Sequence, residues 1–200
     1  MSIASLQNTL YEYAKLLEQS GLVSESTGNM SARDPSTGQV VIKVSGVPYR
    51  RMSERDFILL TGNGEKTDPT DGRYPSYEMP THMEIYRRFP EIHSVFHTHS
   101  KYTIVLGAVL DEIPCATTPT ENRLLKKPVP FVPFIEHGTQ DMANAIAPYF
   151  EKNVAVVIRN HGPFVVGGSV EEAYTRAVSL ENAAKTVYAM KLLGHVGLIS

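Results

Sequence analysis

The sequence is poor in cysteine, in long apolar runs and in charge of one sign. Its single cysteine, Cys115, cannot form an intramolecular disulfide, which fits a reducing compartment. The formal net charge is −2 and no block of lysine or arginine stands out, so the electrostatic footprint of a nucleic-acid-binding protein is missing. No stretch approaches the roughly 18 apolar residues of a membrane span. Residues 1–10 lack the basic and apolar regions of a signal peptide. We therefore expect a cytoplasmic protein that binds neither nucleic acid nor a membrane.

The composition is that of an ordinary globular protein, with 42% hydrophobic and 20% charged residues. A length of 200 residues fits one domain spanning residues 1–200. Apolar spacing predicts helices over 3–19, 80–89, 102–110, 139–150 and 170–193. Apolar or β-branched runs predict strands over 40–44, 57–60, 95–97, 154–158 and 164–166. The stretch 115–133 holds four prolines, so we expect it to be irregular or edge-like. Alternating strands and helices predict an α/β domain with helices on both faces of a mixed sheet.

The stretch His97-Thr98-His99 closes a run of apolar residues that predicts a buried strand. Residues two apart on a strand point to the same side, so His97 and His99 can bind one divalent cation together. Imidazole suits zinc, copper, nickel and iron, and a catalytic zinc site usually has three protein ligands. His161 directly follows another buried strand and is the natural third ligand. Spacing alone does not exclude ordinary hydrogen-bonded histidines, and it points His93 the same way; we treat His93 as a surface residue.

Glu78, between a Gly/Pro-rich loop and a helix, is the candidate carboxylate. It can ligate the metal or act as a base if burial raises its pKa toward neutrality. The alternative is a helix N-terminal acid favoured by the helix dipole.

Three turns look suited to bind an anion, because each combines backbone N–H groups with hydroxyl or amide donors. They are Gly28-Asn29, Ser45-Gly46 and Ser76-Tyr77, and Lys43 adds positive charge nearby. Such turns are common, but three of them beside a candidate metal site suggest a phosphorylated or carboxylated ligand.

Taken together, these segments resemble the class II aldolase/adducin family. The matching motifs are Gly28-Asn29-Met30-Ser31, Lys43-Val44-Ser45-Gly46-Val47, Pro75-Ser76-Tyr77-Glu78, His97-Thr98-His99-Ser100 and Asn160-His161-Gly162-Pro163. Their order and spacing match from about residue 6 to residue 193. The resemblance implies a three-layer α/β/α sandwich around a mixed, mostly antiparallel sheet, and a homotetramer with active sites at subunit interfaces. It also implies that His97, His99 and His161 bind a divalent metal, usually zinc and in some members manganese.

Position 78 separates two types within this family. The L-fuculose-1-phosphate aldolase type has glutamate there and the L-ribulose-5-phosphate 4-epimerase type has aspartate, so Glu78 favours an aldolase. Lys43-x-Ser45-Gly46 and Pro80-Thr81-His82 look more like the epimerase.

Two further positions depart from the aldolase pattern. The phosphate pocket of the family often has Ser-Ser before the acid, whereas the second residue here is Tyr77. Its ring either narrows the pocket or turns away. The tyrosine that aldolases contribute from a neighbouring subunit falls near Thr118, and the interface acid of the epimerase falls near Glu121. We take Glu121 as a candidate acid/base, the alternative being a solvated loop acid.

The resemblance predicts a metal-dependent lyase that cleaves a small ketose 1-phosphate to a triose phosphate and an aldehyde through an enediolate. Glu78 would move protons at the enediolate carbon. The phosphate would be held by Asn29, Lys43, Ser45, Gly46, Ser76 and Tyr77. A pentulose-phosphate 4-epimerase and a 3-oxo acid phosphate decarboxylase are alternatives with the same metal-enolate chemistry. A third is a non-enzymatic module like the adducin head domain, which lacks the metal histidines.

Overall fold

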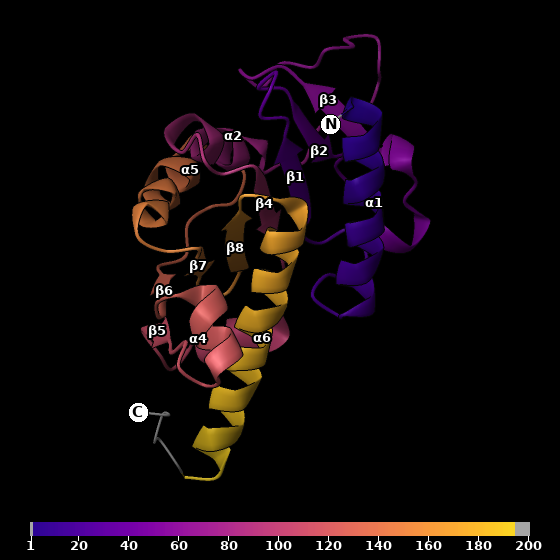
Figure 1. Ribbon diagram of the computed structural model, residues 1–200. Coiled ribbons are helices and arrows are strands. Elements are labelled where there is room, and N and C mark those ends of the chain that lie inside the picture. Colours follow the sequence, from indigo (N-terminus) through magenta and orange to yellow (C-terminus); the bar gives the residue numbers. More distant parts are fainter. Residues whose placement is uncertain (1, 195–200) are drawn as a thin grey trace.

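The computed structural model describes residues 2–194 and has a central eight-stranded sheet between two layers of helices (Figure 1). The sheet order is β3-β2-β1-β4-β8-β7-β6-β5. Within the described residues, β6 and β7 pair in parallel and the other neighbours pair antiparallel. The strands are β1 Asn29–Arg33, β2 Val40–Lys43, β3 Phe57–Leu60, β4 Ser94–His97, β5 Glu112–Ile113, β6 Val129–Val132, β7 Ala155–Ile158 and β8 Gly162–Gly167. The expected mixed, mostly antiparallel sheet is confirmed.

The helices divide between the two faces of the sheet. One layer holds α1 Ile3–Gln19, α3 Lys101–Leu106, α4 Pro119–Leu125 and α6 Val170–Leu192, which contact one another through α6. The other holds α2 Met79–Arg88 and α5 Gln140–Ile146. Short 3₁₀ segments cover Tyr49–Arg51, Glu54–Asp56 and Ala147–Glu151. Among the described residues, no helix has both the length and the apolarity that crossing a membrane requires.

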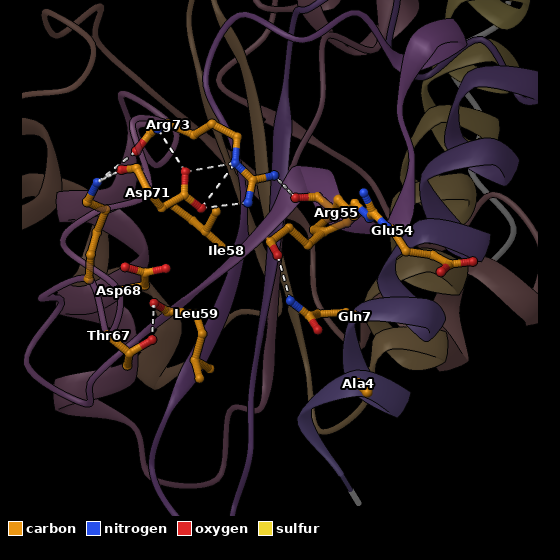
Figure 2. A pocket seen from close by; sticks show the side chains of 12 residues that line it. Ala4, Gln7, Glu54, Arg55, Ile58, Leu59, Thr67, Asp68, Asp71 and Arg73 are labelled. Atoms are coloured by element: carbon orange, nitrogen blue, oxygen red, sulfur yellow. Dashed lines mark hydrogen bonds and ion pairs between the residues drawn. The ribbon is translucent and has the colours of Figure 1, made fainter.

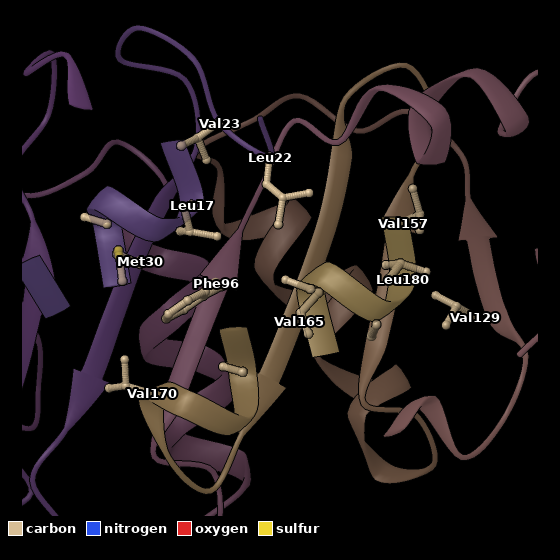
Figure 3. Packing of buried hydrophobic residues seen from close by; sticks show 14 of the residues in the cluster. Leu17, Leu22, Val23, Met30, Phe96, Val129, Val157, Val165, Val170 and Leu180 are labelled. Carbon is tan, nitrogen blue, oxygen red and sulfur yellow. The ribbon is translucent and has the colours of Figure 1, made fainter. Parts of the chain in front are cut away.

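Each face of the sheet has its own apolar core, because side chains alternate along the strands. On β4, Phe96 packs on the α1/α6 side and Val95 on the α2/α5 side. On β8, Val165 and Phe164 divide in the same way. Figure 3 shows Phe96, Val165 and Leu180 of α6 in the first of these cores. Burial on both faces explains why these strands read as continuous apolar runs rather than as alternating patterns.

Hydroxyl caps begin several helices where the apolar spacing predicts them. Ser2 accepts a hydrogen bond from the Ser5 amide at the start of α1, and Ser169 accepts from the Glu172 amide at the start of α6. The helices predicted over 3–19 and 170–193 are therefore confirmed to within a residue.

The stretch 115–133 was expected to be irregular or edge-like, and the first alternative was wrong, whereas its strand β6 lies next to the edge strand β5. That stretch contains helix α4 and strand β6. Pro119 occupies the first turn of α4, where a missing N–H costs nothing, and the Thr118 hydroxyl caps the helix by accepting from the Glu121 amide. Other bounds also differ, among them that of the helix predicted over 139–150, which is α-helical only over α5 and continues as a 3₁₀ segment. The helix predicted over 102–110 ends at Leu106, and β1 begins inside the segment that we took for a turn.

Candidate active site

The candidate site lies at one end of the central strands β1, β4 and β8, where β4 ends and β1 and β8 begin. His97 is the last residue of β4, and in the antiparallel registers it faces Asn29, the first residue of β1, and Phe164 near the start of β8. The tight connection from β7 to β8 carries His161, and Asn160 takes a positive φ of 59° to make that turn. The sheet therefore brings together residues that lie far apart in the sequence.

The three histidines converge on one point. A single ligand nitrogen from each of His97, His99 and His161 lies within 4.8 Å of the other two. The Nε2 atoms of His97 and His99 are 3.1 Å apart. Ligand atoms around a tetrahedral zinc, with bonds of about 2.0 Å, are separated by roughly 3.3 Å. The three predicted side chains therefore lie together, and their spacing fits one divalent cation.

Hydrogen bonding fixes which nitrogen of His97 is available. Its Nδ1 lies 3.0 Å from the carbonyl oxygen of Pro163, which only accepts, so Nδ1 carries the proton and Nε2 presents its lone pair. Burial lowers the pKa of His97 well below its ordinary value. Burial also lowers the pKa of His99, and it lowers that of His161 to about 4, with the charge of His97 as a second cause. All three rings are therefore neutral at pH 7, which is the form that binds metals.

Glu78 closes the fourth side of the cluster. Its Oε2 lies 3.3 Å from His97 Nε2, and its Oε1 lies 3.3 Å from His161 Nε2. Burial raises the pKa of Glu78, while the electrostatic interaction with His161 and a hydrogen bond from Asn29 act in the opposite direction. Oε1 is buried without a hydrogen-bond partner among the described residues. Three nitrogen lone pairs and a carboxylate with an unsatisfied oxygen form a donor set that suits a divalent cation. Glu78 occupies the N-cap position of α2 without capping it, so its side chain serves the cluster rather than the helix.

A cavity of about 500 Å³ opens beside this cluster. Its lining includes residues of all three turns that were predicted to bind an anion, with Lys43 beside them, together with Glu78, His99 and His161. The turn residues are Gly28, Asn29, Ser45, Gly46, Ser76 and Tyr77. The backbone N–H of Ser45 donates to Tyr74 and that of Ser76 donates to Lys43, so these two amides are already engaged. The hydroxyl groups of Ser45 and Ser76 and the backbone N–H of Gly46 donate no hydrogen bond within the described residues, whereas Asn29 Nδ2 already donates one to Glu78.

Lys43 supports one of these turns from behind. Its side chain is almost fully buried, and Nζ donates to the carbonyl oxygens of Val47 at 2.9 Å and Val44 at 3.2 Å. Burial lowers the pKa of Lys43 to about 8. In this conformation the ammonium group shapes the turn at Ser45 and adds positive charge beneath it.

Tyr77 lies at the rim of the cavity, and its ring turns outward. The side chain is 64% exposed and packs beside His137, with ring centroids 5.5 Å apart. It also covers Gly138, where an added Cβ would stand 2.0 Å from Tyr77 Cε1. Of the two alternatives posed by the sequence, the ring turns away rather than filling the cavity. His137 in turn lies beside His161, with centroids 5.9 Å apart.

His137 and Phe134 line the cavity but were missed by sequence reasoning. Neither residue has a spacing that links it to the metal histidines. The only local signal is the glycine that follows His137, whose φ of +73° marks a turn.

Two other predicted positions lie outside the cavity. Glu121, in the first turn of α4, is buried, and its Oε2 has no hydrogen-bond partner among the described residues. His93 precedes β4 at the opposite end from His97, so it does not join the metal cluster.

A second hollow lies between α1 and the edge strand β3 (Figure 2). Three of its charged side chains are held by one another or by backbone carbonyls. Arg73 forms an ion pair with Asp71 at 2.5 Å, and Lys66 donates to the backbone carbonyls of both residues. These three side chains therefore differ from the histidines and the carboxylate that converge beside the first cavity.

Comparisons with known proteins agree with this geometry. The family model of the class II aldolase and adducin N-terminal domain matches residues 8–188. A 5-deoxy-D-ribulose 1-phosphate aldolase from Bacillus thuringiensis serovar kurstaki is 28% identical, over all of this chain and 92% of its own length. Among solved structures, an L-fuculose 1-phosphate aldolase has a TM-score of 0.90 at 24% identity, covering 100% of this chain and 92% of that one. The L-fuculose-1-phosphate aldolase from Thermus thermophilus has a TM-score of 0.84 at 25% identity, covering 98% of both chains. The fold, the ordered motifs and the match over residues 8–188 show that this chain belongs to the class II aldolase and adducin family.

Proposed function

We propose that this protein is a metal-dependent aldolase that cleaves a small ketose 1-phosphate to a triose phosphate and an aldehyde. The observation that carries the proposal is the convergence of three neutral imidazoles and the Glu78 carboxylate on the wall of a cavity with anion-binding turns. A relative that covers the whole chain is named as an aldolase of a ketose 1-phosphate, which supports the substrate class.

In this proposal His97, His99 and His161 hold a divalent cation, zinc in the first place and manganese as the alternative. When bound, the ion supplies the positive charge that stabilises the enediolate as the C3–C4 bond of the ketose breaks. Glu78 moves the proton at the enediolate carbon. A raised pKa brings its carboxyl closer to neutral pH, where a general base is most effective.

The turns hold the phosphate at the other end of the substrate. Asn29, Ser45, Gly46 and Ser76 provide donors on one side of the cavity, and Lys43 adds charge beneath them. Tyr77 closes the rim. Binding energy gathered at the phosphate, away from the reacting bond, orients the carbonyl end against the cluster.

The family resemblance supports three further parts of the proposal. The protein would act as a homotetramer, it would be located in the cytoplasm, and Glu121 of a neighbouring subunit would serve as an acid/base at the site.

The proposal is tested by running the reaction in the direction of synthesis. Purified protein with stoichiometric zinc is incubated with dihydroxyacetone phosphate and a series of small aldehydes, and products are identified by mass. Ketose 1-phosphates are expected. Glu78→Gln should retain zinc and lose most of the rate, whereas Glu151→Gln, at an exposed position away from the cavity, should match the unchanged protein.

Either of two results would overturn the assignment. The first is the absence of product from every aldehyde, combined with epimerisation of a pentulose phosphate or release of carbon dioxide from an oxo-acid phosphate. The second is a Glu78→Gln variant with an unchanged rate, which would remove Glu78 from the mechanism.

A further inference from the structure

A continuous chain of buried hydrogen bonds runs from Glu78 away from the cavity. Glu78 Oε2 is 2.7 Å from Asn29 Nδ2, and Asn29 Oδ1 is 2.6 Å from His82 Nε2. His82 Nδ1 is 2.7 Å from the Ser31 hydroxyl, which is 2.8 Å from the Tyr86 hydroxyl. All five side chains are buried, and His82 is completely inaccessible. The proposed function uses only Glu78, as the base, and Asn29, as a phosphate donor, from this line of five side chains.

This line of hydrogen bonds forms where residues at helical spacing on α2 face residues at strand spacing on β1. Glu78, His82 and Tyr86 follow one another at intervals of four, so they lie on one face at the start of and along α2. Asn29 and Ser31 are two apart on β1, so they point to the same side of the sheet. Packing α2 on the sheet therefore interleaves the two sets into a single line.

The direction of every bond in this line is determined. An amide oxygen carries no proton, so His82 Nε2 must donate to Asn29 Oδ1. Burial lowers the pKa of His82 to about 3, which keeps the ring neutral, so its Nδ1 must accept. Ser31 then donates to Nδ1, and Tyr86 must donate to Ser31. All the donors therefore point toward Glu78.

We propose that His82 is a positioning residue for the aldol chemistry, acting through Asn29 on the carboxylate of Glu78. The inference rests on the proposed function of Glu78. The Nε2–H group of His82 fixes the Asn29 amide with its nitrogen toward Glu78. Without that donor the amide is free to turn over, which places its oxygen against the carboxylate and removes a hydrogen bond from a buried charge. An amide does not pass protons along, so the line orients the base and does not relay protons.

The first test is the tautomer of His82, and it does not require turnover. The zinc-loaded protein is labelled with ¹⁵N-histidine, and His82 is assigned by the loss of its signals in His82→Gln. The Nε2–H tautomer is expected, unchanged between pH 6 and pH 8. In Ser31→Ala the Nδ1 partner is lost, so a mixture of tautomers is expected. An Nδ1–H tautomer in the unchanged protein would overturn the inference.

The second test separates positioning from structure by kinetics. The rate of solvent deuterium exchange at the hydroxymethyl carbon of dihydroxyacetone phosphate reports the proton transfer assigned to Glu78. His82→Leu should lower kcat for exchange about 10- to 100-fold with KM changed less than about threefold, the range typical of groups that orient site residues. His82→Gln keeps an N–H donor and should recover most of the rate.

Zinc content and circular dichroism verify that each variant is folded and loaded. His93→Gln, which changes a histidine at the far end of β4, is the matched control and should leave the exchange rate unchanged. If His82→Leu is folded, zinc-loaded and fully active, or if His82→Gln is as slow as a folded His82→Leu, the inference is wrong. If the unchanged protein shows no exchange and forms no ketose phosphate, the proposed function fails instead, and the tautomer result still stands by itself.

Discussion

Gly162→Ala should push the three metal-binding histidines apart without replacing any of them. Gly162 follows His161 directly, and an added Cβ would stand 2.2 Å from the carbonyl oxygen of Thr98, between His97 and His99. It would also stand 3.3 Å from His97 Cε1. Because the obstacle is backbone rather than the end of a flexible side chain, the two segments must separate by about 1 Å to reach an ordinary contact.

That separation is large on the scale of metal coordination. Ligand distances hold to within about 0.2 Å, so moving His161 by about 1 Å from the other two histidines converts a three-nitrogen site into a two-nitrogen site. We expect the affinity for zinc to fall by at least about 100-fold. Overpacking of this kind costs about 1–3 kcal/mol in the free energy of unfolding.

The affinity is measured by competition with a chromophoric chelator, and the stability of the metal-free protein by urea denaturation. Gly72→Ala is the matched control, because an added Cβ there meets nothing within 4 Å. We expect it to change stability by less than about 0.5 kcal/mol and to leave zinc affinity unchanged. A Gly162→Ala protein that binds zinc as tightly as the unchanged protein would refute the placement of His161 against the 97/99 pair.

Three further outcomes are expected. Chelation should abolish turnover and lower Tm, since metal at 1,000 times its Kd stabilises a folded protein by about 4 kcal/mol, and zinc should restore both; full turnover in chelator would exclude the metal. In acid, an unfolded chain protonates His82 below its ordinary pKa of 6.5, whereas the folded chain, with a pKa of about 3, does not. His82 alone should therefore lower the stability as the pH drops below 6.5, by about 1.4 kcal/mol per pH unit and roughly 3 kcal/mol by pH 4, and the lowered pKa values of His97, His99 and His161 add to this fall in the metal-free protein. Urea titrations should show a shallower fall in His82→Gln, and equal slopes would contradict the buried, neutral ring. Tyr77→Ser should change stability by less than about 0.5 kcal/mol, because the ring is 64% exposed, but should open the rim and lower KM for bulkier aldehydes; unchanged selectivity would remove Tyr77 from the substrate path.

Local pattern predicts most of the fold because each strand has to fill two cores. The runs over 57–60 and 154–158 are wholly apolar and have no polar face, which only a sheet covered on both sides permits. The run over 40–44 is interrupted only by Lys43, which is buried beside the candidate site. The pattern failed over 115–133, where four prolines outweighed the cap at Thr118. Composition does not distinguish a proline in the first turn of a helix from a proline in an irregular loop. Only the geometry of the helix cap does so.

Spacing in the sequence predicts the metal ligands but not all of the other residues that line the cavity. His97 and His99 are neighbours in the chain, and a buried strand end brings His161 to them through the antiparallel pairing of β4 with β8. His137 and Phe134 reach the cavity on a loop after β6, and no periodic constraint fixes where such a loop passes. The same loop carries Gly138, which Tyr77 covers from a segment about 60 residues away, so local pattern does not predict this contact.

The behaviour of Glu78 depends on a balance that no single residue type encodes. Burial raises the pKa of its carboxyl, while the histidine cluster and the Asn29 amide lower it. If the pKa of the carboxyl is too high, it remains protonated at neutral pH, and if the pKa is too low, the carboxylate takes up a proton reluctantly. Asn29 lowers the pKa of Glu78 only when its amide nitrogen points toward the carboxylate, and His82 holds it in that orientation. The basicity of Glu78 therefore depends on His82, one turn further along α2, which contacts neither the metal nor the substrate.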